Sequence, residues 1–133
     1  LVAQVMEVHI EDGTVRVDRV VLAVDPGFAV SPDGLRAQME SGVVFGLTAA
    51  LFGDITLESG AVSQSNFHDY PMLRMDEAPP IETHIINSMA PWGGAGEPGT
   101  PGVAPALVNA VFDATGVRVR ELPLAKQDFS DWG

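Results

Sequence analysis

The sequence has no cysteine, and this absence removes several chemical roles at once. Disulfides, thiolate metal ligands and cysteine-bound iron–sulfur clusters all need that side chain. Basic residues are also scarce, because 7 Lys and Arg stand against 18 Asp and Glu and leave a net charge of −11. Such a charge repels phosphate backbones and anionic lipid surfaces, which argues against a nucleic-acid or membrane partner.

Long apolar runs are missing as well. No stretch approaches the roughly 20 apolar residues of a membrane-spanning helix, and no basic segment with an apolar core opens the chain. With 133 residues and 46% hydrophobic content, the chain is long enough for one compact domain with its own core. It begins at Leu1 and runs directly into strand-like sequence, so we expect a single piece, residues 1–133, of a longer protein.

The apolar pattern predicts an α+β fold with a mixed sheet. Alternation on both sides of Asp12-Gly13 predicts an N-terminal β-hairpin, because this dipeptide favours the positive-φ turn that matches strand twist. Apolar residues at every fourth position predict a helix over about 32–52. A second amphipathic helix is predicted over about 101–115, ending at Gly116.

Shorter elements are predicted between and after the two helices. They are a strand pair over 54–58 and 61–64, a long proline-punctuated loop over 67–80, a strand over 81–87 and a final strand over 117–124. The last residues, 126–133, are mostly polar and predict a tail that docks on the domain or frays.

A turn of glycines and prolines over residues 93–102 contains a single carboxylate, that of Glu97. Glycines let the main chain approach a bulky ligand closely, and prolines fix the turn so that its charged side chain is aimed. With Thr100 as the cap of the next helix, nearby N–H groups keep Glu97 ionised, as a general base requires. The spacing alone fits a surface glutamate favoured by the helix dipole equally well.

One stripe of the first predicted helix has little side-chain bulk. It consists of Gln38, Gly42, Phe45, Gly46 and Ala49. Glycine lowers helix propensity, so the stripe is most easily explained by another element that packs closely against it. The alternative is a ligand whose edge is recognised by Gln38.

The positions of the histidines in the sequence predict neither a catalytic set nor a metal site. Adjacent residues such as His68 and Asp69 rarely face each other, and no cysteine nucleophile is present to complete a catalytic set. His9, His68 and His84 share no metal-ligand spacing. The glycine-rich turn also lacks the Lys-Ser or Lys-Thr pair of a phosphate-binding loop.

The glycine-rich turn nevertheless carries a family resemblance. Residues 94–101 (GAGEPGTP), followed by 103–107 (VAPAL), resemble the signature of the large, molybdenum-binding subunit of the xanthine dehydrogenase and aldehyde oxidase family. Within that family, the isoquinoline 1-oxidoreductase β-subunit branch is similar at 36–47 (RAQMESGVVFGL), 64–71 (QSNFHDYP) and 73–77 (LRMDE). The resemblance spans about residues 3–128 and makes the chain look like the C-terminal piece of a molybdopterin-binding domain.

The resemblance implies a molybdopterin cytosine dinucleotide cofactor that carries molybdenum without a permanent protein ligand to the metal. It implies that Glu97 is the catalytic base, that Gln38 contacts the cofactor, and that the backbone of Ala95 and Gly96 lines it. The implied reaction is hydroxylation of an N-heteroaromatic compound or an aldehyde with oxygen from water. The implied partners are the remainder of the large subunit and a small subunit that holds iron–sulfur clusters.

Departures from the family pattern leave a competing interpretation open. Family subunits are several times longer than this chain, so the chain alone is expected to be inactive. The alternative is a non-catalytic binding or assembly module, in which the turn and the small-residue helix dock on another domain. Pro26 and the run 99–102 differ from commoner members, so the substrate pocket cannot be carried over by analogy.

Overall fold

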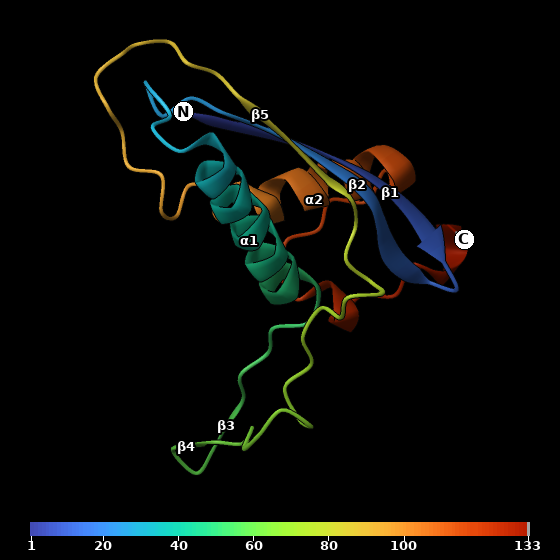
Figure 1. Cartoon of the computed structure of the whole chain (residues 1–133). Coiled ribbons are helices and arrows are strands. Elements are labelled where there is room, and N and C mark those ends of the chain that lie inside the picture. Colours follow the sequence, from blue (N-terminus) through green and yellow to red (C-terminus); the bar gives the residue numbers. More distant parts are fainter. Residues whose placement is uncertain (133) are drawn as a thin grey trace.

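A three-stranded sheet is the base of the fold (Figure 1). In the computed structural model, which describes residues 1–132, the strand order is β1 (Val2–Glu11), β2 (Thr14–Val24), β5 (Ile81–Ile85). The first two strands pair antiparallel, whereas β5 runs parallel to β2. The prediction of a mixed sheet is therefore confirmed.

The hairpin between β1 and β2 turns at the dipeptide that the sequence indicated. Asp12 and Gly13 both have positive φ, 49° and 73°. This conformation matches the twist of the flanking strands, and glycine adopts it without steric penalty. The inward face of the hairpin carries its buried apolar residues, so the turn fixes which side of β1 and β2 faces the core.

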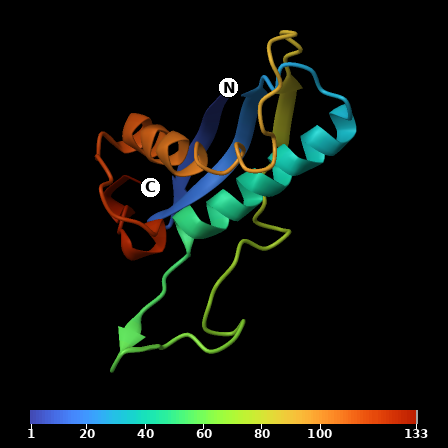
Figure 2. The same ribbon diagram turned by 90° about the vertical axis from the view of Figure 1, so that its left-hand side faces the viewer.

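Two helices cover one face of the sheet, as the turned view shows (Figure 2). The first, α1 (Pro32–Leu51), confirms the predicted helix over 32–52. The second, α2 (Val103–Thr115), begins two residues later than predicted and ends at Gly116, whose φ of 73° is the left-handed cap conformation. Of the helices within residues 1–132, none combines the length and apolar character needed to cross a membrane.

The core lies between the sheet and both helices. Its largest fully buried side chains are Val20, Leu22, Val24, Met39, Val43, Leu47, Val103, Leu107 and Val111. Full burial of such a side chain stabilises a fold by about 1.5–3 kcal/mol, before entropy is counted. Because these residues come from β2, α1 and α2, the three elements depend on one another.

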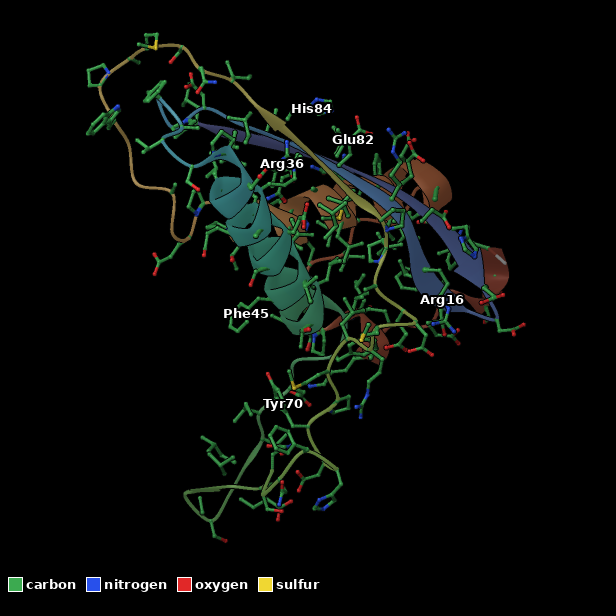
Figure 3. The ribbon with its side chains drawn as sticks, viewed as in Figure 1. Arg16, Arg36, Phe45, Tyr70, Glu82 and His84 are labelled. Carbon is green, nitrogen blue, oxygen red and sulfur yellow. The ribbon has the colours of Figure 1, made fainter. Side chains whose placement is uncertain are left out.

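The small residues of α1 allow the chain before α2 to approach closely. A Cβ on Gly46 would lie 2.7 Å from the Val103 side chain, and one on Gly42 would lie 3.2 Å from the Gly99 backbone. The packing interpretation therefore holds for the two glycines. Phe45 is 70% exposed and points away from the core (Figure 3), and Ala49 is exposed too, so the five stripe residues do not share one surface.

Residues 53–80 form an arm that extends away from the sheet and helices (Figure 1). The arm contains the two-residue strands β3 (Leu57–Glu58) and β4 (Ala61–Val62), which are shorter than predicted, and continues as the irregular loop that the prolines predicted. Its apolar side chains are largely uncovered: Ile55, Leu57, Val62, Phe67, Met72 and Met75 are between 45% and 97% exposed.

Hydrogen bonds give the arm its shape in place of a core. The Asp69 carboxylate accepts the backbone N–H groups of Asn66 and Ser65, at 2.9 and 2.8 Å, and the Ser65 hydroxyl at 2.9 Å. The Asn66 N–H first, and then Ser65, lower the pKa of Asp69 to about 2. At neutral pH the carboxylate therefore stays ionised and fixes this turn.

The predicted final strand over 117–124 is wrong. The Arg118 guanidinium lies 3.4 Å from the ring centroid of Phe112 and donates to Asn109 Oδ1 at 3.0 Å. Both partners belong to α2, so these contacts hold the segment on the helix, and none of the strands within residues 1–132 pairs with it. An alternating sequence without a neighbouring strand does not become part of a sheet.

The C-terminal tail docks and does not fray within the described residues. It contains two short 3₁₀ helices, η1 (Leu124–Lys126) and η2 (Ser130–Trp132). Between them Phe129 is 2% exposed, and its N–H donates to the Gly13 carbonyl at 3.2 Å. The tail thus closes the core at the turn of the β1–β2 hairpin; Gly133 lies outside the described residues.

Candidate functional site

The glycine- and proline-rich turn, residues 93–102, lies directly on α1. Gly99 is buried, and a Cβ there would come within 2.9 Å of the Met39 carbonyl oxygen. The Thr100 hydroxyl donates to the Gly42 carbonyl at 3.2 Å, so Thr100 ties the turn to α1. The prediction that Thr100 caps α2 is wrong, because Gly102 occupies the cap position and makes no side-chain bond.

Two glutamine amides hold the part of the turn that contains Glu97. Gln38 Nε2, from α1, donates to the Gly96 carbonyl at 2.5 Å. Gln4 Nε2, from β1, donates to the Gly99 carbonyl at 2.6 Å. Glu97 lies between these two carbonyls in sequence, so its backbone is tethered on both sides by side chains from different elements.

The Glu97 side chain is exposed, and it lines a shallow open hollow together with Gly94, Gly96, Pro98 and Pro101. The Thr100 N–H donates to the Glu97 carbonyl at 3.0 Å, which closes a tight turn behind the carboxylate. Such a geometry presents an acceptor oxygen to whatever enters the hollow while its backbone is fixed. This is the arrangement that a general base requires.

A neighbouring hollow is lined by Gln38 and Ala95 and has two aromatic walls, Phe28 and Trp92. Ala95 is half-buried, whereas Trp92 is 75% exposed. The structure therefore brings the four predicted site residues together through Gly96, which Gln38 contacts directly and which borders Glu97. Apolar aromatic walls beside a few polar groups suit a flat organic ligand.

The loop that leads into the turn is bound to the end of β2. The Ser88 hydroxyl donates to Asp25 Oδ1 at 2.8 Å, and the Gly93 N–H donates to the Pro26 carbonyl at 3.0 Å. Gly27 has φ 90° and leaves no room for a Cβ beside the Ala90 carbonyl, so only glycine fits. The Gly27 N–H first, and then Ser88, lower the pKa of Asp25, which favours the ionised form that accepts these bonds.

The histidines lie apart from this site in the described part of the chain. His9 Nδ1 is 2.8 Å from Asp18 Oδ1, and His84 Nε2 is 2.7 Å from Glu82 Oε1, both on exposed strand positions. Within residues 1–132, no three side chains of His, Asp or Glu come together in a way that would hold a metal ion.

A third hollow lies at the C-terminal end of α1. Its walls are mainly apolar side chains from β2, α1, the arm and η1: Val15, Val17, Leu47, Leu51, Phe52, Leu73, Pro79 and Leu124. We interpret it as a packing hollow at the base of the arm, because most of its lining is apolar and its Glu77 carboxylate already accepts the Arg74 N–H at 2.9 Å.

Sequence reasoning missed Gln4 and the Asp25–Ser88 contact. Gln4 is the one polar residue among the inward positions of β1, where Val2, Met6 and Val8 are its apolar companions. A polar residue within an apolar, alternating face was the available signal, because such a side chain needs a partner. Nothing in the sequence indicated that Ser88 would contact Asp25, 63 positions away.

Comparison with known proteins identifies the family of the chain. A model of the family described as "Molybdopterin cofactor-binding domain" matches residues 1–79. The chain is 41% identical over 125 residues to isoquinoline 1-oxidoreductase subunit beta of Brevundimonas diminuta, covering 92% of this chain and 16% of the relative. It is 36% identical over 126 residues to a membrane-bound aldehyde dehydrogenase (pyrroloquinoline-quinone) of Gluconacetobacter polyoxogenes, covering 93% of this chain and 16% of that protein.

The fold agrees as well. The crystal structure of quinoline 2-oxidoreductase from Pseudomonas putida 86 superimposes with a TM-score of 0.77 at 19% identity, over 86% of this chain and 16% of that one. The architecture is thus that of an α+β molybdopterin-binding domain. The chain belongs to the molybdopterin cofactor-binding domain family, as a part of a molybdenum-binding subunit of the xanthine dehydrogenase type. It spans about a sixth of the length of these relatives, 16% in each case.

Proposed function

We propose that this chain forms one wall of the active site of a molybdenum-dependent hydroxylase and that Glu97 is its catalytic base. The observation that supports this most is the exposed carboxylate on a turn held by Gln4 and Gln38. A base must be fixed within hydrogen-bond reach of the proton that it removes, and a tethered backbone meets that need. A surface glutamate favoured only by a helix dipole needs no such tethers.

The residues around Glu97 fit a large cofactor. Around Gly93, Gly94 and Gly96, no atom of the described chain apart from the adjoining residues lies within 4 Å of where a Cβ would be, so their backbone is open to close approach. Gln38 retains its Oε1 and a second N–H for a ligand, and the Ala95 backbone borders the same hollow. We assign these groups to molybdopterin cytosine dinucleotide, which when bound supplies the redox centre for the two electrons removed from the substrate.

The net reaction adds a hydroxyl group from water to a carbon of the substrate and releases two electrons and two protons. The Glu97 carboxylate accepts a proton from the water-derived oxygen as the carbon–oxygen bond forms. A small partner subunit with iron–sulfur clusters takes the electrons onward. The substrate class is an N-heteroaromatic compound or an aldehyde, and the aromatic walls formed by Phe28 and Trp92 favour the flat heteroaromatic ring.

The test uses the full-length subunit purified with its partner. We expect stoichiometric molybdenum by elemental analysis, a pterin by fluorescence after release, and oxygen from ¹⁸O-labelled water in the product of isoquinoline turnover. An aliphatic aldehyde serves as the comparison substrate, and the 133-residue chain alone should show no turnover. A preparation with neither molybdenum nor pterin would contradict the proposal and favour the assembly module.

The exposed arm supports the view that further segments of the large subunit pack on this chain. Its two-residue strands cannot stabilise a hairpin alone, and its apolar side chains need a cover. Residues 54–80 hold five acidic groups and one basic residue, Arg74, so two arms would repel each other. We infer that the remainder of the same polypeptide, and not a second copy, covers the arm.

Photo-cross-linking checks this inference. A benzophenone amino acid at Phe67, which is 79% exposed, should cross-link to a distant peptide of the same large subunit in the full-length enzyme. The same probe at Glu11, on the hairpin, gives the background level. Cross-links that join two large subunits or reach the small subunit, or a yield at Phe67 no higher than at Glu11, would contradict the inference.

A further inference from the structure

We propose that Gln4 is a positioning residue for the Glu97 carboxylate. This inference rests on the proposed function, because it assigns a role within the same site. The Gln4 amide donates to the Gly99 carbonyl at 2.6 Å, while Gln38 donates to the Gly96 carbonyl at 2.5 Å. The backbone segment that contains Glu97 is therefore held between one tether from the sheet and one from α1.

The sheet tether is anchored firmly. Gln4 lies in the antiparallel ladder opposite Leu22, which is fully buried in the central strand β2. Its carboxamide also touches the next part of the turn, since a Cβ on Gly102 would lie 3.0 Å from Gln4 Cδ. Movement of Gly99 or Gly102 relative to the sheet is thus resisted by one side chain. The position of this part of the turn therefore depends on the position of β1.

The side-chain oxygen of Gln4, Oε1, shows that a contribution to stability alone does not explain why a glutamine occupies this position. Gln4 Oε1 is buried and has no hydrogen-bond partner among residues 1–132. A buried, unpaired acceptor destabilises a fold. Rotating the amide would place Oε1 against the Gly99 carbonyl, so two acceptors would face each other. The orientation of the amide is therefore set by its bond to the turn.

Gln4→Met separates positioning from stability. Methionine has a similar length and packs in the same apolar surroundings, but it cannot donate to Gly99. The substitution removes one buried unpaired oxygen, Oε1, and creates another, the Gly99 carbonyl. We therefore expect the thermal midpoint to change little, while the turn loses its side-chain tether to the sheet.

The experiment uses the cofactor-loaded, full-length enzyme with its partner subunit. Gln4→Met should lower kcat by about tenfold or more with little change in KM, because a small misplacement of a catalytic group reduces rate strongly. Hydrogen exchange should become faster at the amide of the buried Gly99 and at that of Thr100, which donates to the Glu97 carbonyl. Met6→Ala is the matched control: Met6 is the next inward residue of β1, is 6% exposed and makes no hydrogen bond to the turn. It should lower the thermal midpoint and leave the exchange of the turn unchanged.

The outcomes separate this inference from the proposed function. If Glu97→Gln abolishes most turnover while Gln4→Met keeps normal kcat and normal exchange, the positioning role alone is overturned. The same holds if the loss of kcat in Gln4→Met merely follows its loss of thermal stability, as in Met6→Ala. If Glu97→Gln turns over normally, the base assignment fails and the role of Gln4 fails with it.

Discussion

Replacing Glu97 by glutamine in the full-length, cofactor-loaded subunit is expected to reduce turnover by about 10²–10⁴-fold, the usual contribution of a general base. Glutamine keeps the size of the side chain and its hydrogen-bonding capacity, but it cannot accept a proton at neutral pH. The backbone tethers from Gln4 and Gln38 do not involve this side chain, so the turn should keep its shape. Steady-state kinetics should show the loss mainly in kcat.

Glu121→Gln is the control for this experiment. Glu121 is an exposed glutamate outside the turn, so the same loss of one negative charge should leave kcat unchanged. Molybdenum content and the thermal midpoint should equal those of the wild type in both variants, which excludes cofactor loss as the cause. Normal turnover by Glu97→Gln with a full complement of molybdenum would refute the assignment of Glu97 as base.

Truncating Leu107 to alanine is expected to lower the free energy of unfolding of the 133-residue chain by about 2–5 kcal/mol, the range for buried leucines. Leu107 is fully buried in α2. The close contacts of the α1 glycines with the start of α2 restrict the movement of neighbouring residues into the cavity that the truncation would create. Urea unfolding followed by far-ultraviolet circular dichroism measures the difference.

Leu57→Ala provides the matched comparison. Leu57 is 70% exposed on the arm, so the same loss of atoms should change the free energy of unfolding by less than about 0.5 kcal/mol. If both leucines gave equal effects, α2 would not be packed on the sheet and α1 as described. The closely packed glycine contacts between the helices would then also be in question.

The order and type of the main elements followed from the sequence. Asp12-Gly13 specified the hairpin because its positive φ values suit a two-residue turn, and the four-residue apolar repeat specified α1. These signals are local, since each depends on residues that are close together in the chain. The segment 117–124 shows the limit of such local signals. Its apolar–polar alternation is typical of a strand, but the contacts of Arg118 hold it on α2, and none of the strands within residues 1–132 pairs with it.

The candidate site followed from the sequence only in part. The glycine- and proline-rich turn identified Glu97, and the resemblance added Gln38, Ala95 and Gly96. The structure brings these residues together, because Gln38 donates to Gly96 beside the carboxylate. It also corrected Thr100, which ties the turn to α1 and does not cap α2.

By itself, the sequence determined a glycine- and proline-rich turn with one carboxylate, an α+β arrangement of elements and a chain without cysteine ligands. Only the tertiary structure decided how that carboxylate is held. Gln4 and Gly99 are 95 positions apart in the chain, and their contact depends on β1 and the turn before α2 meeting across the core. Long-range contacts of this kind arise from packing. The polar Gln4 among apolar neighbours indicated a need for a partner, but the residues around Glu97 carried no pattern that identified the partner.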